Sequence, residues 1–585
     1  MSRRSEVHQS PFGDLEEKNG TSEAEFNPFG LDGGDIEQPS AEAEAAGQAE
    51  TIRVASYGLT RPPQVVYQEM SPFDDKTGLA VAAIVDDSTK DGILLPPAFE
   101  YGGPDSKPSI IRNRRFRFYA ALTISILIAL VLSAIAIAMT HKNGESKEHT
   151  QASVTLLEKR YRDQFVAEVG EKVNIAGSPY DRAAKWIIKE DPFSLSPDAI
   201  NLIQRYHLVL FYYLTTKNGK ESWNSCNPPG ANETDTCVYQ DIEFTDTFVE
   251  YTIYRNVSDS VRWMSGMHEC DWTGVFCDEA DNLIAIQVSG QNCTGGLPTE
   301  IAQLPYLQAI ALYHNEFTGT LPQVYAEMKQ LVSLELHYNG LTGQIPDSYW
   351  RADSLQHLNL GANLLSGSIS SRIGMLSQMK GLYLFDNKLS GTIPSELGQL
   401  EFMSYLHLNR NDLFNDIPTE LGKLTLLREL WLWENGLDGT IPSELGLMSD
   451  MENMEIYENE LTGTIPDEIY SLTHMISFDV NWCRLTGTLS TRIGQLTRME
   501  RFRVSTNDLT GTIPSEVASL RSIVLFWFHK TRFTGIVPTS LCSLRPDPLV
   551  ILQADCNPSG NPAVECLCCS HCCDRLSGIC LSTDI

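Results

Sequence analysis

Apolar and polar positions recur every 24 residues from Ile286 to about Leu541. The core of each unit reads Leu-x-Leu-x-x-Asn, as in Leu334, Leu336 and Asn339. Successive side chains of a strand point to opposite sides, so the two leucines face inward and the residues beside them face outward. Counting from Ile286 to Phe526 gives eleven units without an insertion. This period predicts short units that stack into a solenoid with one continuous parallel sheet.

A second pattern is the run of 23 residues at 118–140 without a charge, glycine or proline. At about 1.5 Å per residue, a helix of this length spans about 34 Å, enough for a hydrocarbon core of about 30 Å. Four arginines crowd its N-terminal flank, and fewer basic residues follow it. This asymmetry predicts one transmembrane helix with the N-terminus in the cytoplasm and the C-terminus outside. The cysteines agree, because all 14 lie between Cys226 and Cys580, on the oxidising side.

The segment before the span, residues 1–117, is expected to be a disordered acidic cytoplasmic tail. Residues 1–107 hold 20 acidic and 8 basic residues and no sustained apolar period. The tail is too short for a kinase domain and lacks a kinase's phosphate loop and catalytic motifs. Asn27-Pro28-Phe29 resembles ligands of endocytic adaptors, and Tyr67-Gln68-Glu69-Met70 resembles a sorting signal. The net charge of −31 argues against nucleic acid as a partner.

The segments between the span and the repeats carry helical patterns. In the juxtamembrane region, 141–195, apolar residues from Val154 to Val169 recur at three- to four-residue steps and predict an amphipathic helix. This helix is expected to pack on the chain's own outer domain, with pairing to a second copy as the alternative. Ser196-Pro197-Asp198 reads as the start of a second helix in an N-terminal cap, 196–282.

The C-terminal region, 542–585, has eight cysteines within 39 residues and no apolar period. It is expected to be a disulfide-stapled cap over the last repeat, in preference to a metal cluster. Cys293 and Cys483 occupy core positions of the repeats, so both are expected to be buried thiols, which leaves twelve cysteines for disulfides. Pairing of Cys293 with Cys277 stays open as an alternative.

Two motifs carry a resemblance to a known family. Each unit ends in a version of Leu-Thr-Gly-x-Ile-Pro, as at 461–466, and Cys270 and Cys277 enclose Asp-Trp-Thr-Gly-Val. These motifs resemble the repeats and the N-terminal cap of plant-type leucine-rich repeat (LRR) proteins. The resemblance implies an α/β solenoid, a right-handed LRR horseshoe of about eleven repeats over 283–541, with disulfide caps that include a Cys270–Cys277 pair. The transmembrane helix and the disordered N-terminal tail complete the expected architecture.

The outward positions of the central strands are rich in aromatic residues and form the candidate ligand-binding surface. Glutamates, including Glu429, Glu434 and Glu458, flank these rings. Aromatic patches with a polar rim are typical of binding hot spots, although strands also favour aromatic residues on propensity alone. Ring stacking suits a carbohydrate as well as a peptide. The candidate residues are Tyr383, Phe385, Tyr405, His407, Trp431, Trp433, Glu455 and Tyr457.

The sequence contains none of the common motifs HExxH, GxSxG, the P-loop, the dinucleotide fingerprint or the EF-hand loop. His407 near Glu429 and Glu455 has no nucleophile in an evident triad. We therefore expect no enzyme activity, no cofactor and no metal. Sequons at Asn232, Asn256 and Asn292 predict glycans on the outer side.

The functional expectation follows from the resemblance to LRR receptor-like proteins, which lack a kinase and signal through a partner. It implies recognition of an extracellular peptide, protein or carbohydrate ligand and a co-receptor. In that family the repeats precede the membrane span, whereas here they follow it in signal-anchor (type II) orientation, so the partner mechanism does not carry over. Inhibition of secreted hydrolases, as by the similar polygalacturonase-inhibiting proteins, and structural adhesion remain alternatives. The expected location is the plasma membrane, with an endomembrane lumen as the alternative.

Overall fold

The computed structural model describes residues 146–230, 233–237, 260–556, 563–574 and 579–582, with the backbone alone for 146–153. The expected cytoplasmic tail, 1–117, and the apolar segment, 118–140, lie outside these described residues. Within the described part of the chain, no helix has both the length and the apolar character needed to cross a bilayer.

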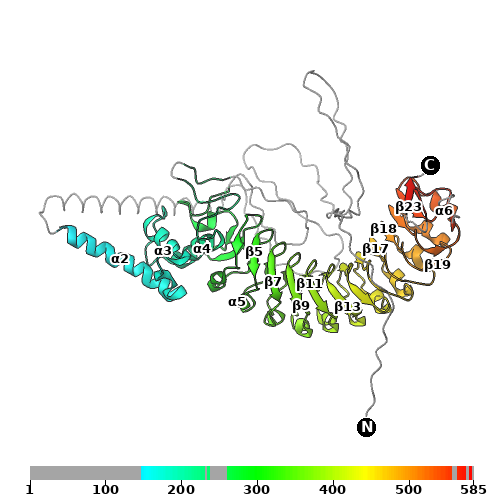
Figure 1. Ribbon diagram of the computed structural model, residues 1–585, viewed down its shortest axis with the longest axis horizontal. Coiled ribbons are helices and arrows are strands. Elements are labelled where there is room, and N and C mark those ends of the chain that lie inside the picture. Colours follow the sequence, from blue (N-terminus) through cyan, green and yellow to red (C-terminus); the bar gives the residue numbers. More distant parts are fainter. Residues whose placement is uncertain (1–145, 231–232, 238–259, 557–562, 575–578, 583–585) are drawn as a thin grey trace, which may run out of the picture. The chain divides into compact units, whose positions relative to one another are not determined.

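The repeats form one long parallel sheet to which each of the eleven predicted units contributes a strand (Figure 1). Figure 1 shows the strands on the inner side of the curve of the repeats and the short helices on the outer side. The predicted leucine-rich repeat solenoid is therefore confirmed. Its strands are β2 (Leu283–Gln287), β4 (Ala309–Ala311), β6 (Ser333–Glu335), β8 (His357–Asn359), β10 (Gly381–Tyr383), β12 (Tyr405–His407), β14 (Glu429–Trp431), β16 (Asn453–Glu455), β17 (Ser477–Asp479), β18 (Arg501–Arg503) and β20 (Leu525–Trp527).

The 24-residue period sets the register of this sheet. Leu382 pairs with Leu358 on one neighbouring strand and with Leu406 on the other. All three side chains are fully buried, and burial of one leucine contributes about 2 kcal/mol to stability. Equivalent residues of successive units therefore form straight rows, both in the core and on the outward face.

A row of asparagines holds the turn that follows each strand. The Nδ2 atom of Asn387 donates to the carbonyl oxygens of Leu360, Leu384 and Phe385 at 3.0–3.2 Å, and its Oδ1 atom accepts from the Leu365 N–H at 2.9 Å. These bonds satisfy backbone groups that the solenoid buries. Asp386, directly before this asparagine, has a left-handed backbone with φ 51°.

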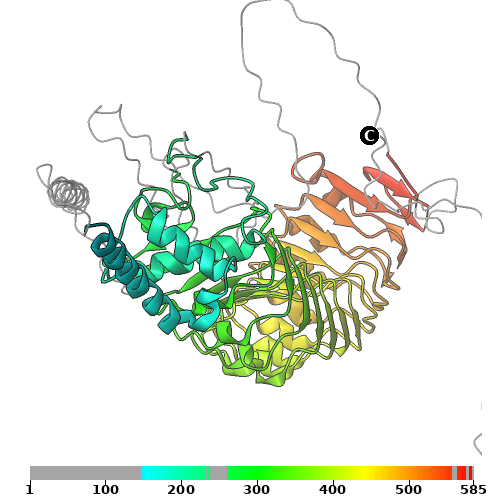
Figure 2. The ribbon, with the colours of Figure 1, turned by 60° about the vertical axis from the view of Figure 1, so that its left-hand side comes forward.

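The outer side of each repeat returns through short helices, and a second sheet lies between these helices and the long sheet (Figure 2). Prolines precede most of these helices. The helices are η4 (Thr299–Gln303), α5 (Gln323–Ala326), η5 (Tyr349–Arg351), η6 (Ser371–Met375), η7 (Ser395–Gln399), η8 (Thr419–Lys423), η9 (Ser443–Leu447), η10 (Asp467–Ser471), η11 (Thr491–Gln495), η12 (Ser515–Ser519) and α6 (Thr539–Cys542). The second sheet comprises β3 (Thr294–Gly295), β5 (Glu316–Gly319), β7 (Gly340–Gln344), β9 (Leu364–Gly367), β11 (Lys388–Gly391), β13 (Asp412–Asp416) and β15 (Gly436–Asp438).

Helices cover the N-terminal end of the solenoid. The predicted amphipathic helix is α2, whose C-terminal half buries Tyr161 and Phe165, while Val154 and Leu157 are exposed. Phe165 stacks on Tyr206, with ring centroids 4.1 Å apart. Part of the expected juxtamembrane region therefore shares the core of the N-terminal cap. The helices are α2 (Ser146–Val169), η1 (Gly170–Asn174), α3 (Pro179–Lys189), α4 (Leu202–Thr215) and η3 (Glu269–Asp271).

The helix start predicted at Ser196 is wrong. Helix α4 begins at Leu202, and Ser196 instead forms a turn in which its carbonyl accepts from the Ala199 N–H at 3.0 Å. Asp198, expected in the first turn, binds Arg160 of α2 at 2.7–2.8 Å. The Ser-Pro start occurs one helix earlier, where the Ser178 hydroxyl accepts from the Asp181 N–H at 3.1 Å.

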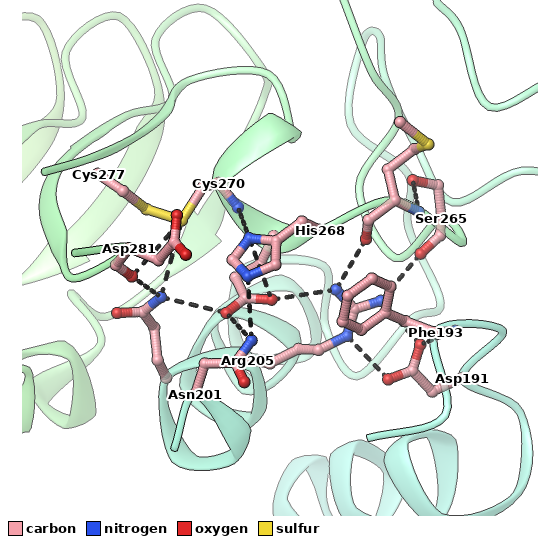
Figure 3. Close-up of polar contacts among 12 residues, drawn as sticks. Asp191, Phe193, Asn201, Arg205, Ser265, His268, Cys270, Cys277 and Asp281 are labelled. Atoms are coloured by element: carbon pink, nitrogen blue, oxygen red, sulfur yellow. Dashed lines mark hydrogen bonds and ion pairs between the residues drawn. A yellow bond between two sulfur atoms is a disulfide. The ribbon is translucent and has the colours of Figure 1, made fainter. Parts of the chain in front are cut away.

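Arg205 of α4 ties the N-terminal cap together (Figure 3). Its guanidinium is fully buried and donates to both carboxylate oxygens of Asp191 at 2.7–2.8 Å, to Glu269 at 3.3 Å and to the carbonyls of Ser265 and Met267. These five bonds use all five donors of the side chain. The network links α4 to Asp191, which follows α3, and to the segment 265–269 that leads into η3, so we interpret it as structural.

The long sheet extends past the repeats into the cysteine-rich region. Leu552 pairs with Phe526 of the last predicted unit. The 24-residue period does not predict this strand, because Phe526 and Leu552 are 26 positions apart. The added strands are β23 (Ile551–Ala554), β25 (His571–Cys573) and the antiparallel β26 (Cys580–Ser582), and the antiparallel β1 (Val275–Cys277) closes the opposite end.

Six disulfides hold the two ends, and Cys293 and Cys483 are buried free thiols, as predicted. The alternative pairing of Cys293 with Cys277 is wrong, because Cys277 is bonded to Cys270. The other pairs are Cys226–Cys237, Cys542–Cys568, Cys556–Cys572, Cys566–Cys569 and Cys573–Cys580.

Candidate functional site

The concave face, defined here as the outward side chains of β4 to β20 and of the two residues after each strand, carries the predicted ligand-binding residues. Phe385, Tyr405, Trp431, Trp433 and Tyr457 are partly exposed there. The expectation that the whole set is exposed is wrong for two other members. Tyr383 and His407 are each 1% exposed, because rings on adjacent strands cover one another.

A row of rings crosses β10, β12 and β14. The Tyr383 ring lies edge-on to the His407 imidazole, with centroids 5.0 Å apart. The imidazole lies flat against the Trp431 indole at 3.8 Å, with 10° between the planes. Tyr405 stacks beside Tyr383 at 6.2 Å. These contacts fix the ring orientations before any ligand arrives.

A second stacked pair, Trp433 and Tyr457, lies two residues after the ends of β14 and β16. Their centroids are 5.1 Å apart, and the planes differ by 6°. Burial first, and then nearby carboxylates, raise the pKa of the Tyr457 phenol. The phenol is therefore neutral and acts as a hydrogen-bonding group at physiological pH.

Phe385 continues the aromatic surface toward the N-terminal repeats. A Cβ atom at Gly361 would lie 2.3 Å from Cε1 of Phe385, so the ring fills the space that this glycine leaves. The same ring contacts Tyr338 edge-on, with centroids 6.1 Å apart. A side chain at position 361 would therefore displace the Phe385 ring from its place on the concave face.

The aromatic surface extends beyond the predicted residues. Tyr313 stacks on His337 at 4.6 Å, and His314 stacks on Tyr338 at 4.2 Å. Burial, followed by the neighbouring His337, lowers the pKa of His314 to about 4, so this imidazole is neutral at physiological pH. Extending the outward columns by two or three 24-residue steps from Phe385 and its neighbours would have found these residues in the sequence.

The imidazole of His407 also binds the Glu429 carboxylate, with 3.1 Å between Nε2 and Oε2. Asn453 donates to the other oxygen of Glu429 at 3.3 Å. The histidine thus packs against Trp431 on one side and is hydrogen-bonded to Glu429 on the other. His407 therefore links the ring row, of which it is a member, to the Glu429 carboxylate. The hydrogen bond of His407 is to Glu429, whereas Glu455 pairs in register with Asp479.

Glu455 and Asp479 are directly paired positions on β16 and β17. Burial and the charge of Asp479 raise the pKa of Glu455 to about 7, while Arg503 and Arg501 oppose this shift more weakly. Arg503 binds Asp479 at 2.9 Å, and burial nevertheless raises the pKa of Asp479. Two carboxyl groups directly opposite each other are unfavourable when both are charged.

Two more glutamates flank the Trp433–Tyr457 pair. Glu434 and Glu458 follow these rings directly, and both have left-handed backbones with φ 50° and 51°. Arg410 binds Glu434 at 3.3 Å and reaches Asp386 at 3.8 Å. Burial, Glu434 and Asp479 raise the pKa of Glu458. The rings therefore lie beside an excess of carboxylates.

The groups of side chains close enough to hold a metal do not offer thiolates. His529 with Cys573 and Cys580, Cys556 with Cys566 and Cys569, and His268 with Cys270 and Asp281 bring their ligand atoms within 4.8 Å of one another. Every one of these cysteines is in a disulfide, and a disulfide sulfur is not the thiolate that metals prefer.

Of the three predicted glycosylation sites, only Asn292 lies within the described residues. Its side chain is exposed, and its Nδ2 atom donates to Asn224 at 2.9 Å. Asn232 and Asn256 lie outside the described residues.

Comparison with known sequences identifies the repeat. A family model described as Leucine Rich Repeat matches residues 378–400. A probable LRR receptor-like serine/threonine-protein kinase of Arabidopsis thaliana is 40% identical over 47 residues, which are 8% of this chain and 7% of the relative. The matched part therefore spans a small fraction of the curated relative.

Similar solved structures include the plant peptide hormone receptor RGFR1 in complex with RGF2, which is 30% identical. The match covers 44% of this chain and 42% of that one, with a TM-score of 0.43. The Arabidopsis receptor kinase HAESA, in complex with the peptide hormone IDA and the co-receptor SERK1, is 27% identical over 51% of this chain and 56% of its own, with a TM-score of 0.43. A plant ice-binding protein is 26% identical over 44% of this chain and 83% of its own, with a TM-score of 0.40.

Proposed function

We propose that this chain is a single-pass membrane protein whose leucine-rich repeat domain binds an extracellular ligand on the concave face. It would act in receptor-like recognition, without a kinase or other catalytic activity of its own, in signal-anchor orientation at the plasma membrane. A co-receptor would then relay the signal, and endocytic adaptors would act on the cytoplasmic tail. The ligand is a peptide, a protein or a glycan.

The observation that carries this proposal is the oriented ring surface. The Trp433–Tyr457 pair and the rings of Phe385 and Trp431 are partly exposed, and neighbouring contacts hold each of them in place. Rigid aromatic side chains lose little entropy on binding and bury a large apolar area. Because the rings are already ordered, binding a ligand costs less conformational entropy than it would on a surface with mobile rings.

The six disulfides support placement of this domain in an oxidising compartment. The test is a tag placed after Ile585 in full-length protein on intact cells. We expect an antibody to reach the tag without permeabilisation. A tag reached only after permeabilisation would overturn the plasma-membrane placement.

The binding role is tested with the purified full-length chain against panels of peptides, polysaccharides and secreted hydrolases. We expect a ligand whose affinity falls when Trp433 is changed to alanine. One-to-one inhibition of a hydrolase would favour the inhibitor alternative, and retention by polymers alone would favour adhesion.

A further inference from the structure

The Trp433–Tyr457 pair lies beside a cluster of carboxylates on the concave face. Four carboxylates, those of Glu434, Glu455, Glu458 and Asp479, lie close enough to raise the pKa of the Tyr457 phenol. They come from three successive repeats, because the 24-residue period brings their strands side by side.

The basic side chains near these carboxylates have partners of their own. Arg501 donates to the Ser477 hydroxyl at 3.4 Å and to the Asn453 side-chain oxygen at 3.5 Å. Arg410 binds Glu434 and Asp386, and Arg503 binds Asp479. Arg503 also lies over the Trp527 ring, 5.1 Å from its centroid. In the part of the chain that the structure describes, no ion pair involves Glu455 or Glu458. The Glu455 carboxylate receives a hydrogen bond from Ser477 at 3.4 Å.

The ring pair itself suits a cation. The face of an indole or phenol ring attracts ammonium and guanidinium groups, by about 0.5–2 kcal/mol according to how far the contact excludes water. Each ring is followed directly by a glutamate, so a cation over the rings would also lie beside carboxylates. Such a cation would relieve the repulsion between Glu455 and Asp479, which are paired across two strands.

Two polar atoms beside the rings point to a peptide over a simple amine. Asn409 is 3% exposed, and its Oδ1 atom has no hydrogen-bond partner among the described residues. The Nε1 atom of Trp433 likewise has none within the described part of the chain. Asn409 and Trp433 occupy equivalent positions of neighbouring repeats, two residues after β12 and β14, and an acceptor and a donor so placed match the N–H and C=O groups of a peptide backbone.

We propose that Trp433, Tyr457, Glu434, Glu455 and Glu458 form a subsite for the guanidinium or ammonium group of a basic side chain in a peptide ligand. This inference rests on the proposed function, because it assumes that the concave face binds a ligand. It narrows the ligand to a peptide with an arginine or lysine at this position.

The experiment uses the purified full-length chain and a random dodecapeptide library displayed on phage. We expect the enriched peptides to share a basic residue. For an enriched peptide whose basic residue is arginine, we replace that arginine with citrulline, which keeps the shape of the side chain and removes its charge. The citrulline peptide should bind about tenfold more weakly. Enrichment of peptides without a basic residue, or equal binding of the citrulline peptide, would overturn the subsite.

A matched pair of variants checks the location. The double variant Glu434→Gln, Glu458→Gln should weaken the arginine peptide about tenfold and leave the citrulline peptide unchanged. The control, Glu420→Gln with Glu444→Gln, removes the same charge at the same 24-residue spacing on the outer helices η8 and η9. It should bind both peptides as the parent does, and equal losses in both variants would overturn the assignment.

Failure of the inference differs from failure of the proposed function. If glycans bind and Trp433→Ala abolishes their binding while no peptide is enriched, the basic-peptide subsite is wrong and the concave face still binds a ligand. If Trp433→Ala changes the binding of no peptide or glycan, the proposed function fails and the subsite fails with it.

Discussion

The imidazole of His407 lies flat on the indole of Trp431, with centroids 3.8 Å apart, while its Nε2 atom contacts the Glu429 carboxylate at 3.1 Å. The histidine is almost fully buried by these two neighbours and by Tyr383. One side chain therefore joins the polar support of the concave face to its ring surface.

Changing His407 to alanine should lower stability by about 2 kcal/mol, because Glu429 would remain buried with one hydrogen bond fewer and Trp431 would lose its stacking partner. The measurement is the thermal unfolding midpoint of the purified full-length chain. His474→Ala is the control; this exposed imidazole bonds only the Ser449 carbonyl among the hydrogen bonds of the described residues, at 3.0 Å, so its loss should lower the midpoint much less. Equal midpoints for the two variants would contradict the supporting role.

Glu455 should make stability fall as pH rises. Its pKa is raised to about 7 in the folded chain, mainly by burial and Asp479, and a glutamate in an unfolded chain has a pKa of about 4.3. Between these values the folded state binds more protons than the unfolded state, so the contribution is intact below about pH 4 and lost above about pH 7.

The change Glu455→Gln removes this dependence. We expect the variant to gain stability over the parent at pH 8 and to gain little at pH 4, with unfolding midpoints as the readout. Asp181 and Glu300 have lowered pKa values and act in the opposite sense in both proteins, so the difference between them isolates Glu455. Glu327→Gln, at an exposed position, should show no such trend, and a constant difference for Glu455→Gln would refute the raised pKa.

Cys483 replaces the turn asparagine in one repeat, and its sulfur reaches the carbonyls of Ile456 and Asn481 only at 3.6–3.7 Å. Asparagine at this position should donate to these carbonyls and accept from the Leu461 N–H, as Asn507 does one repeat later for Leu485. Cys483→Asn should therefore raise stability by about 1 kcal/mol. Cys483→Ala serves as the control, and an increase of the same size in both variants would argue against the hydrogen bonds.

Arg205→Lys should lower stability by about 3–5 kcal/mol, because lysine keeps the charge and cannot donate five hydrogen bonds to a buried network. Thermal unfolding of the full-length chain gives the readout, with Arg521→Lys at an exposed position as the control. A change in midpoint no larger than the control's would show that the network is not needed for the N-terminal cap.

The sequence predicted the solenoid well because each core position repeats the same physical requirement. Leu382 and Asn387 have equivalents at steps of 24 residues, and their packing and hydrogen bonds repeat with them. Where the step changes to 26, between Phe526 and Leu552, the period was lost although the strand pairing continues. The local pattern Ser196-Pro197-Asp198 predicted a helix start, but the chain forms a turn there and Asp198 binds Arg160 of a distant segment.

Strand alternation correctly predicted which side of the sheet the site residues face. It did not predict how exposed their side chains are. Tyr383 and His407 face the predicted side and are still buried, since large rings on neighbouring strands cover each other. The raised pKa of Glu455 depends on Asp479 in the next repeat and on burial, and neither is visible in the Glu455 segment alone.

The central claim is that the concave face holds the ligand. The most direct measurement replaces Tyr457 with the photocrosslinker p-benzoylphenylalanine in full-length protein on intact cells, with the same replacement of the exposed Phe402, which lies on a loop before β12, as the control. We expect irradiation to give a crosslinked ligand from position 457 and none from position 402. A crosslinked species from position 402 alone, or none from either position in cells that respond to the ligand, would contradict the account.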